Sequence, residues 1–429
     1  MATSTSEPTT RTSADTSPKP ERRWPIVVAA VSLQLCLGSV YAWSVFRTPL
    51  ERGYGWSYEE TAAPFRFFLF AYAFGIWIGG SLLDRLGPRA VARMGGLLLL
   101  TGLALASFQR SPLGLAVCYG LIGGLGAGIA YPTPVATLIR WFPERKGLMG
   151  GVGVFGFGAG SLVFAPVIAA VLDGAPHEQA FRLPPTFLTL GVVFAVVGWV
   201  AGGAFRWPPE PTSQAEAPAA WGTAPLRTVR TWPYPALWLC FLMASGVGLA
   251  AINEASPLLE RLGQAQGGWI APALGVGLMA VANGAGRLLW GFAADRLGRR
   301  AAMALMFAVL AGSALLYTVA RSQPPAVCAL IGIGLCFGGM LGMLPTNVGG
   351  FFGTRCFGSN YGMTYTAFAL AAWLAPAFVS ASVRQGLASG SATAAHAAGG
   401  RLLLAAALVG LAAALTLRGG ARPTAAEGR

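Results

Sequence analysis

Twelve apolar segments of about 20 residues each divide this chain of 429 residues, and they constrain its fold more than any other feature. Hydrophobic residues make up 55% of the sequence and charged residues 11%, about half the charged fraction of a soluble domain. A helix needs about 20 mostly apolar residues to cross a bilayer. We therefore predict an all-α membrane protein with twelve transmembrane helices near residues 24–46, 62–83, 91–109, 113–139, 147–172, 184–205, 235–257, 270–293, 301–320, 324–345, 360–383 and 399–417.

A basic loop motif occurs twice along the chain. Gly80–Arg89 reads GSLLDRLGPR and Gly291–Arg300 reads GFAADRLGRR, and each copy ends one apolar segment and precedes the next. The two aspartates, Asp84 and Asp295, are 211 residues apart (295 − 84 = 211). Parallel repeats of this kind are typical of secondary transporters. The motif therefore predicts two parallel six-helix pseudo-repeats.

The same repeat divides the chain into five parts. We predict that the N-terminal six-helix half covers residues 24–206 and the C-terminal six-helix half covers residues 232–417. The polar segment 207–231 links them. Residues 1–23 are rich in Ser, Thr and Pro and contain no apolar signal-peptide core, so they predict a disordered arm. Residues 418–429 form the expected C-terminal tail.

The basic residues predict the orientation of the chain in the membrane. The net charge is +14, and most of it lies in alternate short loops. Loops rich in Arg and Lys remain in the cytoplasm, which predicts that both termini, the arm, the linker and the tail are cytoplasmic. We expect a monomeric, multi-pass protein of the cell inner (plasma) membrane. Its expected partner is the lipid bilayer, and no nucleic acid partner is expected. The richest loops contain Arg85, Arg89 and Arg93, Arg140, Arg145 and Lys146, and Arg296, Arg299 and Arg300.

Residues suited to covalent or metal chemistry are sparse. The six cysteines fall within or at the ends of apolar segments, a pattern that predicts neither a disulfide framework nor a metal site. The two histidines, His177 and His396, are expected in outer loops. An enzyme in the membrane would need a nucleophile, a metal cluster or an acid pair inside the spans. We therefore predict no metal, no cofactor and no enzymatic activity.

The strongest candidate for substrate binding is Arg287, in the eighth segment. A charged side chain at bilayer depth costs roughly 2.5–3.5 kcal/mol, so it usually has a function. Arg287 lies about 12 Å inside the cytoplasmic end of its helix, and Asn283, four residues earlier, shares its face. A guanidinium can bind a carboxylate through two hydrogen bonds, and an adjacent amide can complete the orientation of the anion. Gly284 and Gly286 thin the helix, as a cavity would require. The residue 211 positions before Arg287 is Ile76, so the positive charge is confined to one half. The alternative is an arginine that extends to the headgroups or pairs with a helix end.

Two further charged residues lie near the predicted outer ends of helices. Arg66 is in the second segment, where an interfacial arginine is the favoured interpretation over a ligand. Glu254 is predicted to end the seventh segment. This carboxylate could carry a proton, although a role in capping or gating that end of the helix is favoured.

The charged residues of the duplicated motif predict a mechanical role. Each Asp can bind the N-terminus of a neighbouring helix, and the arginines can bridge across the cytoplasmic face. Such contacts would hold one conformation closed until the halves rock against each other. The predicted gating residues are Asp84, Arg85, Arg89, Asp295, Arg296 and Arg299.

Aromatic residues deep inside several segments predict the walls of a binding site. Helix packing alone would also explain any one of them. The hydroxyl of a tyrosine needs a hydrogen-bond partner in lipid, so the tyrosines are stronger candidates than the phenylalanines. The set comprises Tyr41, Tyr131, Phe157, Phe337, Tyr365 and Phe368.

Six segments of the sequence resemble the major facilitator superfamily and, within it, the oxalate/formate antiporter family, which is related to the monocarboxylate transporters. They are GSVYAWS at 38–44, GWS at 55–57, GIAYPTP at 128–134, RWFPERKG at 140–147, NGAGRLLWGF at 283–292 and NYG at 360–362. The resemblance implies the major facilitator fold and alternating access around a midplane carboxylate site. In that family the arginine matching Arg287 holds a substrate carboxylate. The aromatic residues that cage the substrate match Tyr41, Tyr131, Phe157, Phe337 and Tyr365.

One departure from the family bears on the substrate. Oxalate transporters of this family carry a lysine in the eleventh span, at the position that matches Phe368. A dianion held by Arg287 alone would keep an uncompensated negative charge in a low-dielectric cavity, which is costly.

We therefore predict a secondary active transporter of small monocarboxylates such as formate, lactate or pyruvate, which works by proton-coupled symport or by anion exchange. Its expected ligands are a small organic anion and, for symport, a proton. The alternatives are an oxalate/formate-type dicarboxylate antiporter, a carboxylate-binding membrane sensor, and an exporter of drugs or sugars on the same fold.

Overall fold

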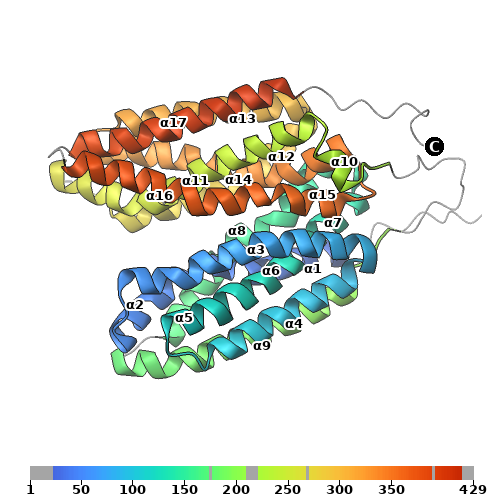
Figure 1. Cartoon of the computed structure of the whole chain (residues 1–429), viewed down its shortest axis with the longest axis horizontal. Coiled ribbons are helices and arrows are strands. Elements are labelled where there is room, and N and C mark those ends of the chain that lie inside the picture. The colour runs from blue at the N-terminus through green and yellow to red at the C-terminus, as the bar shows by residue number, and fades with distance from the viewer. Residues whose placement is uncertain (1–22, 173–175, 209–220, 267–269, 389–391, 418–429) are drawn as a thin grey trace, which may run out of the picture.

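The computed structural model describes residues 23–172, 176–208, 221–266, 270–388 and 392–417. Almost all of these residues are helical, and the helices form two bundles that lie side by side (Figure 1). The predicted arm, except Arg23, the middle of the predicted linker and the predicted C-terminal tail lie outside the described residues.

Each bundle contains the helices of one half of the sequence. The N-terminal bundle consists of α1 (Trp24–Leu37), η2 (Gly38–Ala42), α2 (Trp43–Tyr54), α3 (Tyr58–Leu86), α4 (Pro88–Ala106), α5 (Pro112–Leu115), η3 (Ala116–Gly123), α6 (Gly124–Ala130), α7 (Pro132–Trp141), η4 (Pro143–Arg145), α8 (Lys146–Val171) and α9 (Pro176–Ala204). The short α10 (Pro225–Thr228) leads into the C-terminal bundle, which consists of α11 (Pro233–Gln266), α12 (Pro272–Leu297), α13 (Arg299–Val319), α14 (Gln323–Phe352), α15 (Phe357–Thr364), α16 (Thr366–Ala388) and α17 (Ala392–Thr416).

Within the described residues, eleven helical segments are long and apolar enough to cross a membrane, which makes the chain a multi-pass membrane protein. They correspond to eleven of the twelve predicted spans. The remaining span, predicted at 270–293, is the 26-residue α12. Arg287 and Asn283 lower the hydropathy of α12, yet the helix packs against α14 and α8 like a membrane-spanning neighbour.

The duplicated motif ends α3 and α12 in the same way. Each helix stops at a glycine with positive φ, 78° at Gly87 and 81° at Gly298, where a residue with a side chain would be strained. The next residue starts the following helix in both cases, Pro88 for α4 and Arg299 for α13. The motif therefore builds two equivalent tight helix–helix turns.

Four pairs of helices make the largest contacts between the halves. α3 packs against α15 and α16, and α8 packs against α12 and α14. Figure 1 shows the bundles meeting at one end and diverging toward the other. We call the end at which α3 stops at Leu86 and α12 stops at Leu297 the gate end. At the opposite end, apolar side chains of α8 such as Leu162 and Val167 are exposed.

Candidate functional site

Three of the predicted tyrosines lie where their membrane spans are interrupted. Tyr41 is in the 3-10 segment between α1 and α2, Tyr131 separates α6 from α7, and Tyr365 separates α15 from α16. Pro132 begins α7 and accounts for the break at Tyr131, because proline cannot donate a helical hydrogen bond. Interrupted helices in transporters commonly line the substrate site.

The hydroxyl groups of three tyrosines join the halves near the middle of the molecule. Tyr365 donates a hydrogen bond to Tyr131 across 2.9 Å, and Tyr361 donates to Tyr365 across 3.4 Å. Tyr131 and Tyr365 are each 1% exposed, so neither hydroxyl depends on water. Tyr131 and Tyr365 were predicted because a tyrosine hydroxyl needs a hydrogen-bond partner in lipid, whereas Tyr361 was not among the predicted residues.

Aromatic rings extend this contact into a continuous cluster. Tyr72 of α3 lies 5.3 Å from the rings of both Tyr131 and Phe157, measured between centroids. Phe241 of α11 lies 5.0 Å from Tyr365, and Phe368 lies 5.9 Å from Tyr365. Phe241 and Tyr72 were missed, because an aromatic residue in an apolar span carries no local signal. For Tyr72 a signal existed, since the 211-residue offset pairs it with Asn283.

Phe337 is the one predicted aromatic residue that stands apart. It is buried on α14, and its ring fills the space left by Gly248 of α11. Among the described residues it has no aromatic ring partner. Helix packing therefore describes the role of Phe337 better than lining the binding site does.

Arg287 is fully buried, with 0% of its surface exposed. Its Nε and Nη2 donate to the Asn283 side-chain oxygen across 3.3 and 3.1 Å, as their spacing of one helical turn predicts. Its Nη1 donates to the backbone carbonyl of Val154 on α8 across 2.5 Å. An arginine that extends to the headgroups would not be buried in this way, so that alternative does not describe Arg287.

Arg287 is continuous with the aromatic cluster. Its guanidinium carbon lies 5.9 Å from the ring centre of Phe157, a cation–π contact. The Phe157 ring in turn lies 5.3 Å from those of Tyr41 and Tyr131. Tyr41 is close enough to Arg287 to interact with its charge. Within the described part of the chain, the groups that contact Arg287 are therefore neutral, and no carboxylate is among them.

The amide of Asn283 retains an unused donor. Its oxygen accepts from Arg287, whereas its buried nitrogen has no partner among the described residues. An unsatisfied buried donor costs about 1–3 kcal/mol, which a ligand acceptor would recover. The two glycines expected to thin this helix differ from each other. Gly286 is pressed against the backbone of Leu335 on α14, so it serves close packing, whereas a Cβ at Gly284 would meet only the Phe155 ring, at 3.8 Å.

At the gate end, each motif aspartate binds the start of a helix in the opposite half. Asp84 accepts from the backbone nitrogens of Gly358 and Ser359, across 3.1 and 2.9 Å, at the start of α15. Asp295 accepts from the nitrogens of Gly147 and Leu148, across 2.8 and 2.9 Å, at the start of α8. A carboxylate at a helix N-terminus satisfies free N–H groups and complements the helix dipole.

The motif arginines do not bridge the halves as expected. Arg89 donates to the carbonyl of Gly203 in its own half, and Arg85 is exposed. Arg296 and Arg299 lie over the rings of Phe292 and Phe351, also within their own half. Hydrogen-bond acceptors and aromatic rings of the same bundle lie closer to these side chains than the other bundle does.

A different arginine makes the crossing at the gate end. Arg140 of α7 donates to the carbonyl of Thr354, between α14 and α15, across 2.8 Å. Its guanidinium also lies 3.8 Å from the ring centre of Trp207. Sequence reasoning placed Arg140 in a basic loop and missed this contact, which depends on the position of the other half.

Glu254 does not end its helix, as was expected, because α11 continues to Gln266. The carboxylate is buried and accepts from Ser380 of α16 across 2.5 Å, and Arg261 lies 3.5 Å away. It therefore does not cap the helix end. Arg66 is exposed on α3, away from the buried site, which fits the interfacial interpretation.

The histidines were expected in loops, and this was wrong. His177 lies in α9 and His396 lies in α17, both near the first turn. His396 is buried, and its Nε2 lies 2.7 Å from the carbonyl oxygen of Ala320. These helices start earlier than their apolar segments, because polar residues are tolerated in a first turn.

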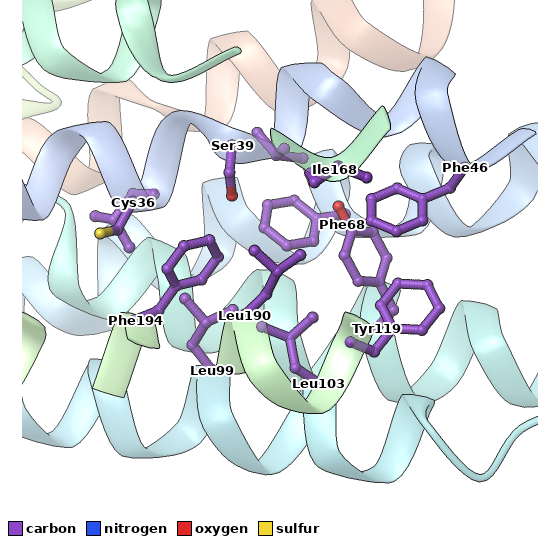
Figure 2. A pocket seen from close by; sticks show the side chains of 13 residues that line it. Cys36, Ser39, Phe46, Phe68, Leu99, Leu103, Tyr119, Ile168, Leu190 and Phe194 are labelled. Atoms are coloured by element: carbon purple, nitrogen blue, oxygen red, sulfur yellow. The ribbon is translucent and has the colours of Figure 1, made fainter. Parts of the chain in front are cut away.

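A small cavity lies inside the N-terminal half (Figure 2). Its volume is about 20 Å³, enough for about one water molecule. Phe46, Phe68 and Leu99 are among its lining residues, which are mostly apolar, and none of the residues around Arg287 contributes to it. This cavity is a packing gap that is separate from the residues around Arg287.

Several known proteins are similar to this chain in sequence. An oxalate:formate antiporter of Oxalobacter formigenes is 29% identical over 356 residues, which cover 81% of this chain and 82% of the relative. The apicoplast pyruvate carrier 1 of Toxoplasma gondii is 25% identical and covers 82% and 83% of the two chains. Monocarboxylate transporter 13 of Rattus norvegicus is 36% identical over 110 residues, or 26% of each chain. All three relatives are named as transporters or carriers.

Solved structures and a family profile place the fold. The proton:xylose symporter XylE superposes with a TM-score of 0.65 at 15% identity, over 90% of this chain and 95% of that chain. The human organic anion transporter MFSD10 gives a TM-score of 0.63 at 16% identity, over 91% and 100%. The profile of the Major Facilitator Superfamily matches residues 28–376. The chain therefore belongs to the Major Facilitator Superfamily.

Proposed function

We propose that this protein is a secondary transporter of small monocarboxylates and that Arg287 holds the carboxylate. One observation carries the proposal: a fully buried guanidinium lies beside an amide with an unused donor and among neutral neighbours. A buried positive charge without a carboxylate partner is costly unless an anionic ligand compensates it. A monoanion neutralises Arg287, while Asn283 donates its free N–H to the same carboxylate.

The remaining groups of the site suit a small, partly apolar acid. The ring of Tyr131 lies 5.3 Å from that of Phe157, and its hydroxyl pairs with the hydroxyl of Tyr365, so these hydroxyl groups can bind a second oxygen of the substrate. Phe241 and Phe368 supply apolar surface on the other side of Tyr365. A transported acid such as lactate or pyruvate has a carboxylate, one further oxygen and a methyl group, which this arrangement matches.

Transport would proceed by alternating access between the two bundles. The contacts of Asp84 and Asp295 with α15 and α8 hold the gate end closed. The basic loops predict that this end faces the cytoplasm, and the structure would then correspond to the state that faces outward. Breaking these contacts lets the bundles rock and expose the site to the other side.

Glu254 is the proposed proton carrier. It is a buried carboxylate with a serine and an arginine as partners, and protonation would weaken its contact with Arg261. If the protein instead exchanges one anion for another, Glu254 has only a structural role.

Uptake into proteoliposomes tests the proposed substrate. Radiolabelled formate, lactate, pyruvate and oxalate are compared with and without a pH gradient, for the native chain, Arg287→Lys and the exposed control Arg110→Lys. We expect uptake of a monocarboxylate by the native chain and by Arg110→Lys, and a loss of roughly 100-fold in Arg287→Lys, because lysine cannot form the bidentate contact. Normal uptake by Arg287→Lys would contradict the role of Arg287.

Uptake of oxalate in the same assay tests the second candidate function, dicarboxylate antiport. A relative is an oxalate:formate antiporter, which favours oxalate as the alternative substrate. Best uptake of oxalate would contradict the argument that one cation selects a monoanion. A requirement for a pH gradient that is lost in Glu254→Gln would select symport over exchange and support Glu254 as the proton carrier.

A further inference from the structure

The hydrogen bond from Arg287 to Val154 crosses between the two halves of the protein. Arg287 belongs to α12 of the C-terminal bundle, and Val154 belongs to α8 of the N-terminal bundle. The bond is short, 2.5 Å, and both residues are fully buried. The residue proposed to bind substrate thus also binds the opposite half of the transporter.

The bond is possible because of Gly158. In an α-helix the amide of residue 158 faces the carbonyl of residue 154, and a side chain at 158 would lie over the same turn. A Cβ at Gly158 would lie 3.1 Å from both Cζ and Nε of Arg287, closer than side chains normally pack. The absence of a side chain leaves the carbonyl open to the guanidinium.

The same helix pair carries the gate contact of Asp295. α8 and α12 approach backbone to backbone at Gly147 and Gly291, and again where Gly151 meets the carbonyl of Arg287. Asp295 binds the first amides of α8 at the gate end of this seam. The bond between Arg287 and Val154 therefore lies at the inner end of a continuous contact that keeps the gate end closed.

We infer that the bond between Arg287 and the Val154 carbonyl is a latch that holds the gate end closed and that a substrate carboxylate releases. A carboxylate binds a guanidinium more strongly than a neutral carbonyl does, so it takes Nη1 from Val154. Losing that bond weakens the contact between α8 and α12, and the gate end opens. Gly158 is the positioning residue of the latch.

Linkage makes this coupling reciprocal. A ligand shifts a conformational equilibrium only by its difference in affinity for the two states, and competition for one donor supplies that difference. Release by a carboxylate rests on the proposed function, whereas the latch itself does not. A contrasting arrangement, in which Arg287 keeps Val154 while it binds substrate, would leave the gate unaffected.

Distances between spin labels at Leu86 and Leu297 measure the state of the gate. These residues end α3 and α12, and each is 53% exposed. Cys328 and Cys356 are first changed to serine so that the labels are specific. The purified chain is measured as it is and as Gly158→Ala, Gly284→Ala and Arg287→Met, each alone and with formate or lactate.

We expect Gly158→Ala to raise the ratio of open to closed gate roughly 10-fold without any ligand, because a charge-assisted hydrogen bond is strained or lost. Gly284→Ala is the matched control, since its Cβ would meet only Phe155, at 3.8 Å, and it should leave the distances unchanged. Arg287→Met removes the donor and should open the gate at least as much. Arg287→Met also tests the latch if Gly158→Ala fails to fold.

Three results separate the inference from the proposed function. Distances in Gly158→Ala and Arg287→Met that equal those of the native chain would overturn the latch. Open gates in both variants, with a native chain that responds to neither formate nor lactate, would support the latch and contradict monocarboxylate transport. A native chain that opens with formate or lactate supports both.

Discussion

The internal repeat of this transporter is preserved in the contacts of the gate end and is broken in the residues at the centre. At the gate, Asp84 binds Gly358 and Asp295 binds Gly147, and the residues of each role are 211 positions apart. The paired glycines repeat as well, because Gly80 meets the backbone of Gly358 just as Gly291 meets that of Gly147. The gate is thus built twice from one pattern.

The centre departs from that pattern. The N-terminal residues that correspond to Asn283 and Arg287 are Tyr72 and Ile76, both buried on α3. Tyr72 belongs to the aromatic cluster, and Ile76 carries no charge. A rocking motion needs equivalent contacts in both halves, whereas one monoanion needs only one positive charge. Under the proposed function, the repeated contacts would serve the rocking motion, and the unrepeated Arg287 would bind the substrate.

The largest predicted effect comes from adding a cation where the second half has Phe368. Phe157 and Phe368 are 211 residues apart and belong to the same aromatic cluster. Phe368→Lys should raise the ratio of oxalate to lactate uptake by roughly 10- to 100-fold, because a second cation would compensate the second carboxylate. Proteoliposome uptake measures the ratio, and Phe368→Met controls for the loss of the ring. An unchanged ratio would show that charge count at the site does not set selectivity.

Neutralising one gate aspartate should have an intermediate effect. Asp84→Asn and Asp295→Asn each weaken a carboxylate contact with a helix N-terminus, worth about 1–2 kcal/mol, or roughly 5- to 30-fold in the open-to-closed ratio. Spin-label distances between Leu86 and Leu297 measure this ratio. Because the backbone contacts are equivalent, the two variants should agree within about threefold, with the larger effect in Asp84→Asn, since Asp84 also accepts from the Ser359 hydroxyl across 2.9 Å. A much larger effect in one half would show that the gate is symmetric in geometry but not in energy.

The smallest predicted effect concerns the hydroxyl pair that joins the halves. Tyr131→Phe and Tyr365→Phe each remove one side of the same hydrogen bond, at a cost of about 0.5–1.5 kcal/mol. Thermal unfolding in detergent should show both single variants less stable, and the double variant little worse than either. Additive losses would mean that the two hydroxyls act independently.

Much of the fold follows from the sequence, whereas the site follows only in part. Apolar length predicts helices and the repeat predicts two halves, since both patterns are written along the chain. Arg287 and Asn283 were found because a charge in an apolar span is costly wherever the helix goes. Phe241 has no such signal, and Glu254 was misplaced because the polar outer turns of α11 extend beyond its apolar segment.

By itself, the sequence determined that the chain spans a membrane as two related halves with one unmatched internal arginine. These properties depend on composition and register, which are local. Only the tertiary structure decided that Asp84 meets α15 and that Arg287 donates to Val154, because these contacts join residues 274 and 133 positions apart. Their partners are fixed by how the bundles pack, and a backbone carbonyl such as that of Val154 has no signature in any sequence.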